Sequence, residues 1–85
     1  MQEFFYEIKN PVGIHVRPAG LLVKEALKYD CSVQIQLSEK TADAKHILSL
    51  LSLGAREGDQ IRIRTQGKDE AHAAVELHRL MDRYL

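Results

Sequence analysis

Alternation of apolar and polar residues in three separate stretches is the feature that most limits what this chain can fold into. Residues 32–37 read Ser-Val-Gln-Ile-Gln-Leu, residues 61–65 read Ile-Arg-Ile-Arg-Thr, and residues 4–8 carry Phe, Tyr and Ile at every second position. Side chains of a strand point alternately to opposite faces, so each stretch predicts a strand with one apolar face. A short partner strand over 40–44 follows the tight turn at Ser38-Glu39.

Between these strands the spacing of apolar residues changes to three and four, which predicts helices. Such a pattern runs from residue 16 to about residue 28, with Pro18 in the first turn, where a missing N–H costs nothing. A short Leu-rich segment over 47–53 ends at Gly54, and a last helix opens at Asp69-Glu70. The predicted order is therefore β-α-β-β-α-β-α.

We predict an α+β fold from this order. Its form is an open-faced two-layer β-sandwich, in which a four-stranded antiparallel sheet is covered on one side by three helices. The chain has 85 residues without a linker or repeat, which is enough for one hydrophobic core. Residues 1–85 are therefore expected to form a single domain.

Charge and cysteine content argue against several classes of protein. Twelve Lys and Arg residues balance twelve Asp and Glu residues, which argues against a nucleic-acid or membrane partner held by bulk charge. Cys31 is the only cysteine, and the sequence shows no secretory leader or long apolar run, so we expect a cytoplasmic protein. The histidines lack metal-ligand spacing and no Gly-rich nucleotide loop occurs, so neither a metal nor a cofactor is expected.

The segment GIHVRP places His15 at the start of the first predicted helix. Ser, Asp or Asn would cap a helix better than His, so capping alone does not explain this residue. The unpaired N–H groups of a first helical turn carry partial positive charge and bind anions such as phosphate. The same charge disfavours imidazolium, so we expect the ring to stay neutral near pH 7 with a nucleophilic nitrogen.

We therefore predict that His15 accepts a phosphoryl group, which lies over the main-chain amides of Val16 and Arg17. The Arg17 guanidinium would bind the same oxygens. One Arg and a few amides suit a carrier, because stronger binding would hinder release of the group. By itself, however, His-x-Arg-Pro spans only four positions and is therefore a weak indicator of this function.

Longer stretches resemble one known family. The segments GIHVRPA, LKYD, KHILSLLSLGAREGD and GKDEAHAAVELHRLMDRYL are similar to those of HPr, the histidine phosphocarrier of the bacterial phosphoenolpyruvate-dependent sugar phosphotransferase system. The resemblance covers essentially the whole chain. It implies the fold predicted above and a carrier rather than an enzyme. It further implies that enzyme I phosphorylates His15 on Nδ1 and that the phosphoryl group, steadied by Arg17, passes to enzyme IIA components.

The short helix carries more apolar residues than one buried face can hold. Leu50 and Leu53 are expected to be core residues. The resemblance implies that Ile47, Leu48 and Leu51 form an exposed apolar patch beside the active histidine, on which partner enzymes dock. The expected rim of this patch consists of Val16, Gly20, Lys24, Leu27, Ser49 and Ser52.

Three residues depart from the family pattern. His46 stands where many Gram-positive relatives carry a regulatory serine, which argues against control by a serine kinase. Val12 replaces a usually polar residue, so a hydrogen bond near the His15 loop is expected to be missing. Gly20 stands where relatives commonly have Ala, and a glycine within a helix costs roughly 0.5–1 kcal/mol.

Two other functions fit parts of the sequence. One is a regulatory binding module that acts on transcription factors or metabolic enzymes, but the carrier-like paralogues of this kind lack the active histidine that this chain keeps as His15. The other is a small-molecule-binding module of the ACT type, which accounts for the fold but leaves His15 and Arg17 unexplained. The sugar that is served and the choice between a monomer and a swapped dimer stay open.

Overall fold

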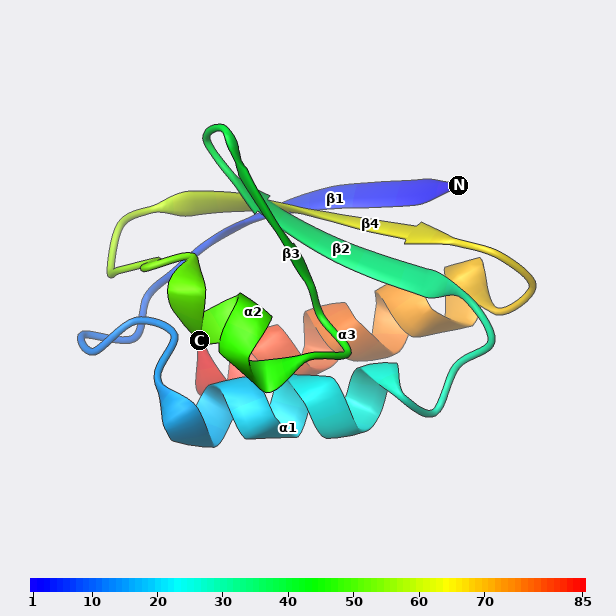
Figure 1. The fold of residues 1–85 in the computed structure, drawn as a ribbon, viewed down its shortest axis with the longest axis horizontal. Helices are drawn as coiled ribbons and strands as arrows, with labels where there is room; N and C mark the ends of the chain where they lie inside the picture. Colours follow the sequence, from blue (N-terminus) through cyan, green and yellow to red (C-terminus); the bar gives the residue numbers. More distant parts are fainter.

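The computed structural model describes residues 1–85, and its helices and strands follow the predicted order (Figure 1). The elements are β1 (Gln2–Glu7), α1 (Val16–Ala26), β2 (Ser32–Leu37), β3 (Lys40–Asp43), α2 (Ile47–Ser52), β4 (Gln60–Gln66) and α3 (Glu70–Tyr84). The longest helix, α3, has 15 residues, and none of the helices is long and apolar enough to cross a bilayer.

Two elements end earlier than the sequence predicts. Helix α1 stops at Ala26 because the N–H groups of Lys28 and Tyr29 bond to carbonyls three residues back and tighten the last turn. Strand β3 stops at Asp43 because the His46 N–H bonds to the Asp43 carbonyl and turns the chain into α2. Both differences arise from local turns that the apolar spacing does not reveal.

The four strands form one antiparallel sheet in the order β1-β4-β2-β3, so β1 and β3 are its edges. In Figure 1 the sheet lies above the three helices, and α1 and α3 run side by side beneath it. The upper face of the sheet carries no helix. The structure therefore confirms the predicted open-faced sandwich.

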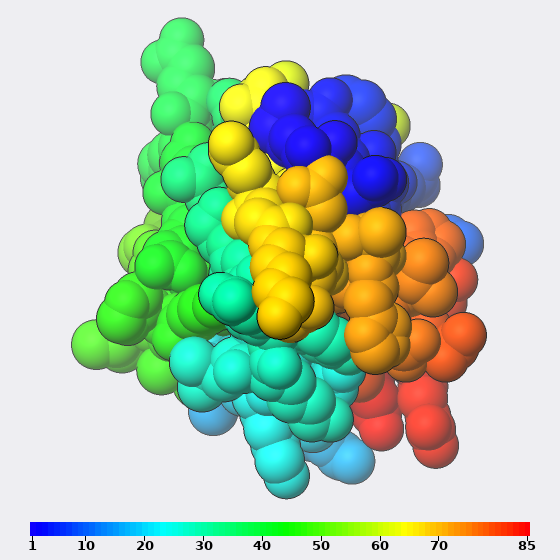
Figure 2. Space-filling view, turned by 90° about the vertical axis from the view of Figure 1, so that its right-hand side faces the viewer, coloured from blue at the N-terminus to red at the C-terminus, as the bar shows by residue number.

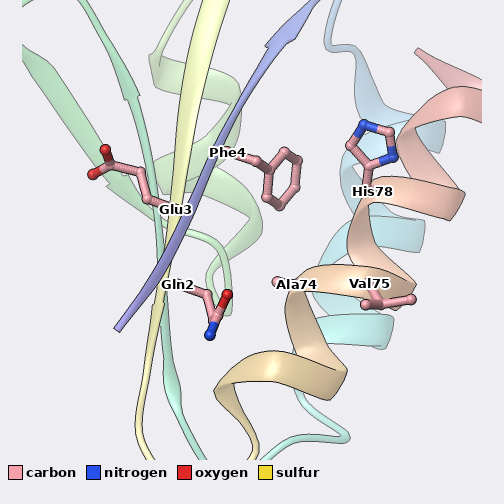
Figure 3. Close-up of a pocket in the computed structure, with 6 residues that line it drawn as sticks. All are labelled: Gln2, Glu3, Phe4, Ala74, Val75 and His78. Carbon is pink, nitrogen blue, oxygen red and sulfur yellow. The ribbon is translucent and has the colours of Figure 1, made fainter.

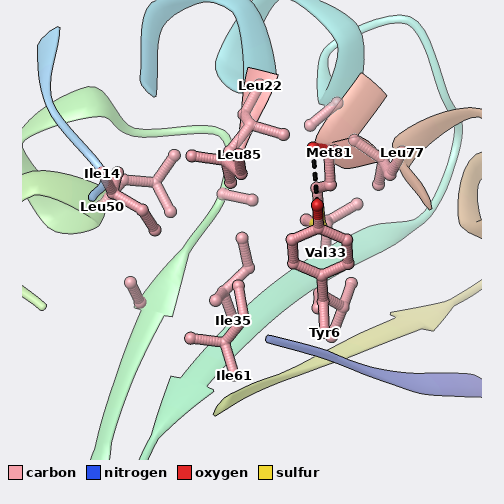
Figure 4. Close-up of a cluster of buried hydrophobic side chains, with 14 of the residues drawn as sticks. Tyr6, Ile14, Leu22, Val33, Ile35, Leu50, Ile61, Leu77, Met81 and Leu85 are labelled. Atoms are coloured by element: carbon pink, nitrogen blue, oxygen red, sulfur yellow. Dashed lines mark hydrogen bonds between the residues drawn. The ribbon is translucent and has the colours of Figure 1, made fainter. Parts of the chain in front are cut away.

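The core lies between the sheet and the helices (Figure 4). Val33 and Ile35 of β2 and Ile61 and Ile63 of β4 are all fully buried, as their alternation predicts. Leu50 of α2 is buried with them. The apolar faces of the strands thus form the surface against which the helices pack.

Two buried groups with polar atoms lie at the boundary of this core. The Tyr6 hydroxyl donates to the Met81 carbonyl at 3.0 Å, which ties β1 to α3 (Figure 4). Burial, and then the nearby charge of Asp82, raise the pKa of Tyr6. Burial also raises the pKa of the Cys31 thiol, so Cys31 behaves as the small buried side chain that the sequence predicts.

The uncovered face of the sheet is polar. Arg62 and Arg64 alternate with the buried isoleucines of β4 and point to solvent, as predicted. The Arg64 Nε donates to a Glu3 carboxylate oxygen at 2.7 Å, and the Arg62 Nε lies 3.8 Å from the same oxygen. Arg62 also donates to the side chain of Gln36. These contacts connect β1, β4 and β2 across the wet face.

A polar cluster closes the C-terminal end of α1. The Tyr29 hydroxyl donates to one carboxylate oxygen of Glu25 at 2.6 Å, and the Lys28 ammonium donates to the other at 3.0 Å. The bond from Tyr29, followed by the contact with Lys28, holds the pKa of Glu25 below its usual value against the opposing effect of burial. A lowered carboxylate pKa stabilises the fold above the unfolded-state pKa, and this contribution is lost as the pH falls through the folded-state value.

We expect Glu25→Gln to lower the free energy of unfolding by about 1 kcal/mol at pH 7, because two charge-assisted hydrogen bonds are weakened. The difference should shrink as the pH falls below 4, where the carboxylate of the wild type becomes protonated. Urea unfolding across this pH range measures it. Glu57→Gln is the matched control, since Glu57 is exposed and forms no ion pair. A Glu25→Gln effect that did not vary with pH would contradict the assignment.

Candidate functional site

The loop before α1 is tied to the end of α3 by Asn10. The Asn10 Oδ1 accepts the Val12 N–H at 2.8 Å, and the Asn10 carbonyl accepts the Gly13 N–H at 2.9 Å. The Asn10 Nδ2 donates to the Tyr84 carbonyl at 3.0 Å, and its main-chain N–H donates to the Leu85 oxygen at 2.7 Å. This bond uses the main-chain N–H of Val12, whereas the hydrogen bond expected to be missing is one that a polar side chain at position 12 would make, so that expectation stays a prediction.

The other side of the loop rests on the segment that follows α2. Gly13 has a φ of +76°, and a Cβ at this position would lie 2.4 Å from the Ala55 carbonyl oxygen. Only glycine fits both the left-handed backbone and this close approach. The next residue, Ile14, is buried and donates its N–H to the same Ala55 oxygen at 3.1 Å. The loop therefore enters α1 in one fixed position.

His15 is the N-cap of α1, as predicted. Its backbone is extended, with φ −119° and ψ −175°, and its carbonyl accepts the Ala19 N–H at 2.9 Å, the first bond of the helix. The half-buried imidazole makes no capping hydrogen bond. Neither ring nitrogen is hydrogen-bonded to another part of the protein, and the first turn of α1 has no side-chain cap.

The first turn of α1 leaves two amides for an anion. Pro18 has no N–H, so Val16 and Arg17 supply the unpaired donors of this turn, which contains no acidic side chain. None of the seven ion pairs in the chain involves Arg17, whose side chain is exposed. The positive end of the helix and a free guanidinium therefore lie on the same side as His15.

A surface pocket of about 320 Å³ gathers this site, lined by Asn10, His15, Arg17, Pro18 and Tyr84. His15 and Arg17 were predicted together from their spacing. The contributions of Asn10 and Tyr84 were missed, although an Asn before Pro-x-Gly is a turn signal that points to the loop. Nothing in the sequence around Tyr84 signals its position, because it joins the pocket from the far end of the chain.

The residues predicted to form a docking face are mostly exposed. Leu48 is 78% exposed, Val16 66% and Leu27 61%, and Lys24 is also exposed. Ile47 borders α1, since a Cβ on Gly20 would lie 3.9 Å from its Cδ1. The exposure predicted for Leu51 needs correction, because this side chain is half-buried and packs against the core. Its role in docking stays a prediction.

The polar residues of α2 act mainly within the protein. His46 is the N-cap of α2 without a side-chain capping bond, and its Nε2 lies 3.6 Å from an Asp43 carboxylate oxygen. The Ser49 Oγ accepts the Asp43 N–H at 3.1 Å, and the Ser52 hydroxyl donates to the Ser49 carbonyl at 2.8 Å. Ser52 is exposed at the rim, whereas Ser49 is half-buried in the turn that joins β3 to α2.

Comparison with known proteins decides the family. Residues 2–83 match the family model described as the HPr component phosphorylation site of the phosphotransferase system. A phosphocarrier protein HPr from Mycoplasma genitalium is 37% identical over 84 residues, which are 98% of this chain and 96% of that protein. The chain belongs to the HPr family.

Solved HPr structures share the same fold. HPr from Thermoanaerobacter tengcongensis superposes with a TM-score of 0.92 at 35% identity, over 96% of this chain and 92% of that one. The histidine-containing phosphocarrier protein of a mycoplasma also gives 0.92, at 31% identity, over 94% and 91% of the two chains. Members of the HPr family are phosphocarriers of the phosphotransferase system rather than enzymes, so the predicted family, fold and general role are confirmed.

Proposed function

We propose that His15 of this HPr-family chain accepts a phosphoryl group from phospho-enzyme I and passes it to enzyme IIA components for sugar uptake. The observation that carries the proposal is the position of the imidazole at the N-cap of α1, without a capping bond and beside two unpaired amides. In the transfer, a neutral ring nitrogen attacks phosphorus, a P–N bond forms, and the bond from phosphorus to the donor atom breaks. We also propose that the chain acts in the cytoplasm, where the phosphoenolpyruvate that starts this relay is made.

Arg17 and the amides of Val16 and Arg17 balance the charge of the bound group. They offer hydrogen bonds to the phosphoryl oxygens at the positive end of α1, where an anion is favoured. The site is a shallow surface pocket rather than a closed cavity, which suits a group that two different enzymes must reach. Modest binding of this kind lets the group leave as readily as it arrives.

The test is phosphorylation by phosphoenolpyruvate and enzyme I. We expect an acid-labile, base-stable phosphate, assigned to His15 by tandem mass spectrometry and discharged when an enzyme IIA is added. An unlabelled protein, in a reaction that labels the Mycoplasma genitalium HPr, would overturn the proposal. If the unlabelled protein also bound a transcriptional repressor, and its His15→Ala variant bound the repressor equally tightly, the regulatory binding module would be the better description.

Partner docking is predicted to depend on Leu48. We expect Leu48→Asp to raise the KM of enzyme I for the carrier by about tenfold or more, because a charge enters an apolar contact. The fold should be unaffected, since Leu48 is 78% exposed. Initial rates of phosphoryl transfer at varied carrier concentration measure the effect. The matched control is Val75→Asp, an exposed apolar residue on α3, and an equal loss in both variants would argue against a docking face at α1 and α2.

Asn10 is predicted to position the His15 loop. Asn10→Ala removes the acceptor for Val12 and the donor for Tyr84, so we expect the free energy of unfolding to fall by about 1–2 kcal/mol and transfer to slow. Asn10→Asp keeps the acceptor but loses the donor, so its stability should lie in between, whereas its added negative charge in the His15 pocket should slow transfer further. Urea unfolding and transfer rates measure the series. Equal stability of the two variants would show that the bond to Val12 is unimportant.

A further inference from the structure

Exposed large apolar side chains fall into two groups on this molecule. Five lie near the His15 loop, α1 and α2: Val12 of the loop, and Val16, Leu27, Ile47 and Leu48, which belong to the predicted docking face. The other three are Met1 (64% exposed), Phe5 (56%) and Val75 (56%), and they lie at β1 and α3. Phosphoryl transfer at His15 does not use this second group.

Strand β1 is an edge of the sheet and pairs only with β4. The Ile8 N–H donates to the Asp59 carbonyl at 2.9 Å, and the Ile8 carbonyl accepts the Gly58 N–H at 2.8 Å, so the main chain of Ile8 faces β4. Main-chain groups alternate in direction along an antiparallel strand. The N–H and C=O groups at Glu3, Phe5 and Glu7 therefore point away from β4, to the free edge.

A groove of about 370 Å³ lies beside this edge, between β1 and α3 (Figure 3). Its lining consists of Gln2, Glu3, Phe4, Ala74, Val75 and His78. The rings of Phe4 and His78 meet edge to face, with centroids 5.1 Å apart, and close one part of it. Figure 2 shows β1, in dark blue, bordering the first turns of α3, in orange. An added strand could therefore bond to the free main-chain groups of β1 and pack against the apolar side chains that line the groove.

The free carboxylate of Glu7 favours a bound segment that carries a basic residue. Glu7 forms no ion pair, and Asp82 pairs only with His78, at 3.4 Å, while Lys9 lies over the Tyr6 ring at 5.9 Å. Glu3, two residues before Phe5, is already bound by Arg64 at 2.7 Å and lies 3.8 Å from Arg62, so the uncompensated carboxylate of this edge is that of Glu7. Opposite charges directly across from each other stabilise a strand pair, which favours a basic residue opposite Glu7.

We propose that the free edge of β1 and the groove beside α3 bind an extended segment of a partner protein as an added antiparallel strand. Main-chain hydrogen bonds to Glu3, Phe5 and Glu7 supply the affinity, and alternate side chains supply the specificity. On the wet face the segment carries a basic residue opposite Glu7 and an aromatic residue opposite Phe5. On the other face it places a β-branched apolar residue in the groove, between Phe4 and Val75.

A designed peptide tests this site directly. The probe is Lys-Val-Tyr-Val-Lys-Thr between Gly-Ser flanks, which sets Lys opposite Glu7, Tyr opposite Phe5 and Val opposite Phe4 in antiparallel register. We expect saturable binding in an NMR titration, with shifts confined to β1, α3 and β4. Exchanging the Lys opposite Glu7 for Glu should weaken binding by about tenfold. Shifts centred on α1 and α2, self-association of the protein instead of binding, or no saturation would each overturn the proposal.

Backbone methylation separates strand addition from nonspecific apolar contact. N-methylation of the peptide Tyr removes an N–H that faces Phe5, whereas N-methylation of the Val opposite Phe4 blocks an N–H that faces solvent. We expect the first peptide to lose binding and the second to keep it. Val75→Asp should weaken binding by about tenfold, and Leu48→Asp should not change it. Equal effects of the two methylations, or equal effects of the two substitutions, contradict the proposed strand.

Discussion

We expect His15→Ser to abolish phosphoryl acceptance and, at the same time, to raise the free energy of unfolding by about 1 kcal/mol. The two effects have opposite signs because the two demands on this position conflict. Serine accepts a hydrogen bond from the first helical turn, and the extended backbone at His15 already has the geometry of an N-cap. The imidazole makes no such bond, so nothing in the cap is lost when it is removed.

Urea unfolding and the enzyme I labelling reaction measure the two parts separately. His15→Ala is the matched control, since alanine can neither cap the helix nor accept a phosphoryl group. This variant should lose the label without gaining stability. A His15→Ser variant that is less stable than the wild type would show that the ring contributes to packing. A variant that still takes a base-stable phosphate would place the carrier nitrogen elsewhere in the chain.

We expect Gly13→Ala to have the largest effect on the structure of the site. The substitution combines a left-handed backbone at φ +76° with a Cβ 2.4 Å from the Ala55 oxygen and 2.8 Å from the Arg56 Cα. The backbone strain and the overpacking together should cost about 2–5 kcal/mol of unfolding free energy. Because Ile14 bonds to the same Ala55 oxygen, the loop must move and carry His15 with it. Transfer should therefore slow even where the protein stays folded.

Gly58→Ala is the control for the backbone contribution alone. Gly58 also has a positive φ, +89°, but no atom lies within 4 Å of the Cβ that it would gain. We expect a loss of about 1–2 kcal/mol and unchanged transfer from this variant. Measuring unfolding and transfer in both variants separates the backbone strain at positive φ from the steric overlap of the added Cβ with Ala55. If Gly13→Ala cost no more than Gly58→Ala, the close approach to Ala55 would not fix the loop.

Much of the fold could be predicted because its signals are local. The alternation of Val33, Ile35, Ile61 and Ile63 identifies both the strands and the faces that become buried. The weaker parts of the prediction lie where local spacing is ambiguous. Four of the six residues of α2 are apolar and Leu53 follows directly, so spacing does not distinguish the exposed Leu48 from the half-buried Leu51. Their environments depend on where α1 and the sheet approach the short helix.

The identity of the edge strands could not be predicted from the sequence either. Several short strands can be recognised from the sequence, but their order in the sheet cannot. The order β1-β4-β2-β3 makes β1 an edge and sets it beside α3. Only then do Phe4 and Val75, which lie at opposite ends of the chain, become neighbours in one groove. The proposed strand-binding site therefore has no local sequence signal.

By itself the sequence determined the order of the elements, the face that each one buries, and the pairing of His15 with Arg17 at the start of a helix. These features follow from spacings of two to four residues, which the geometry of strands and helices converts directly into shared faces. Only the tertiary structure decided that Asn10 and Tyr84 complete the pocket, that Ala55 fixes Gly13, and that β1 is free beside α3. Contacts such as the bond from Asn10 to Tyr84 span 74 positions, so they exist only once the whole core has set the elements against one another.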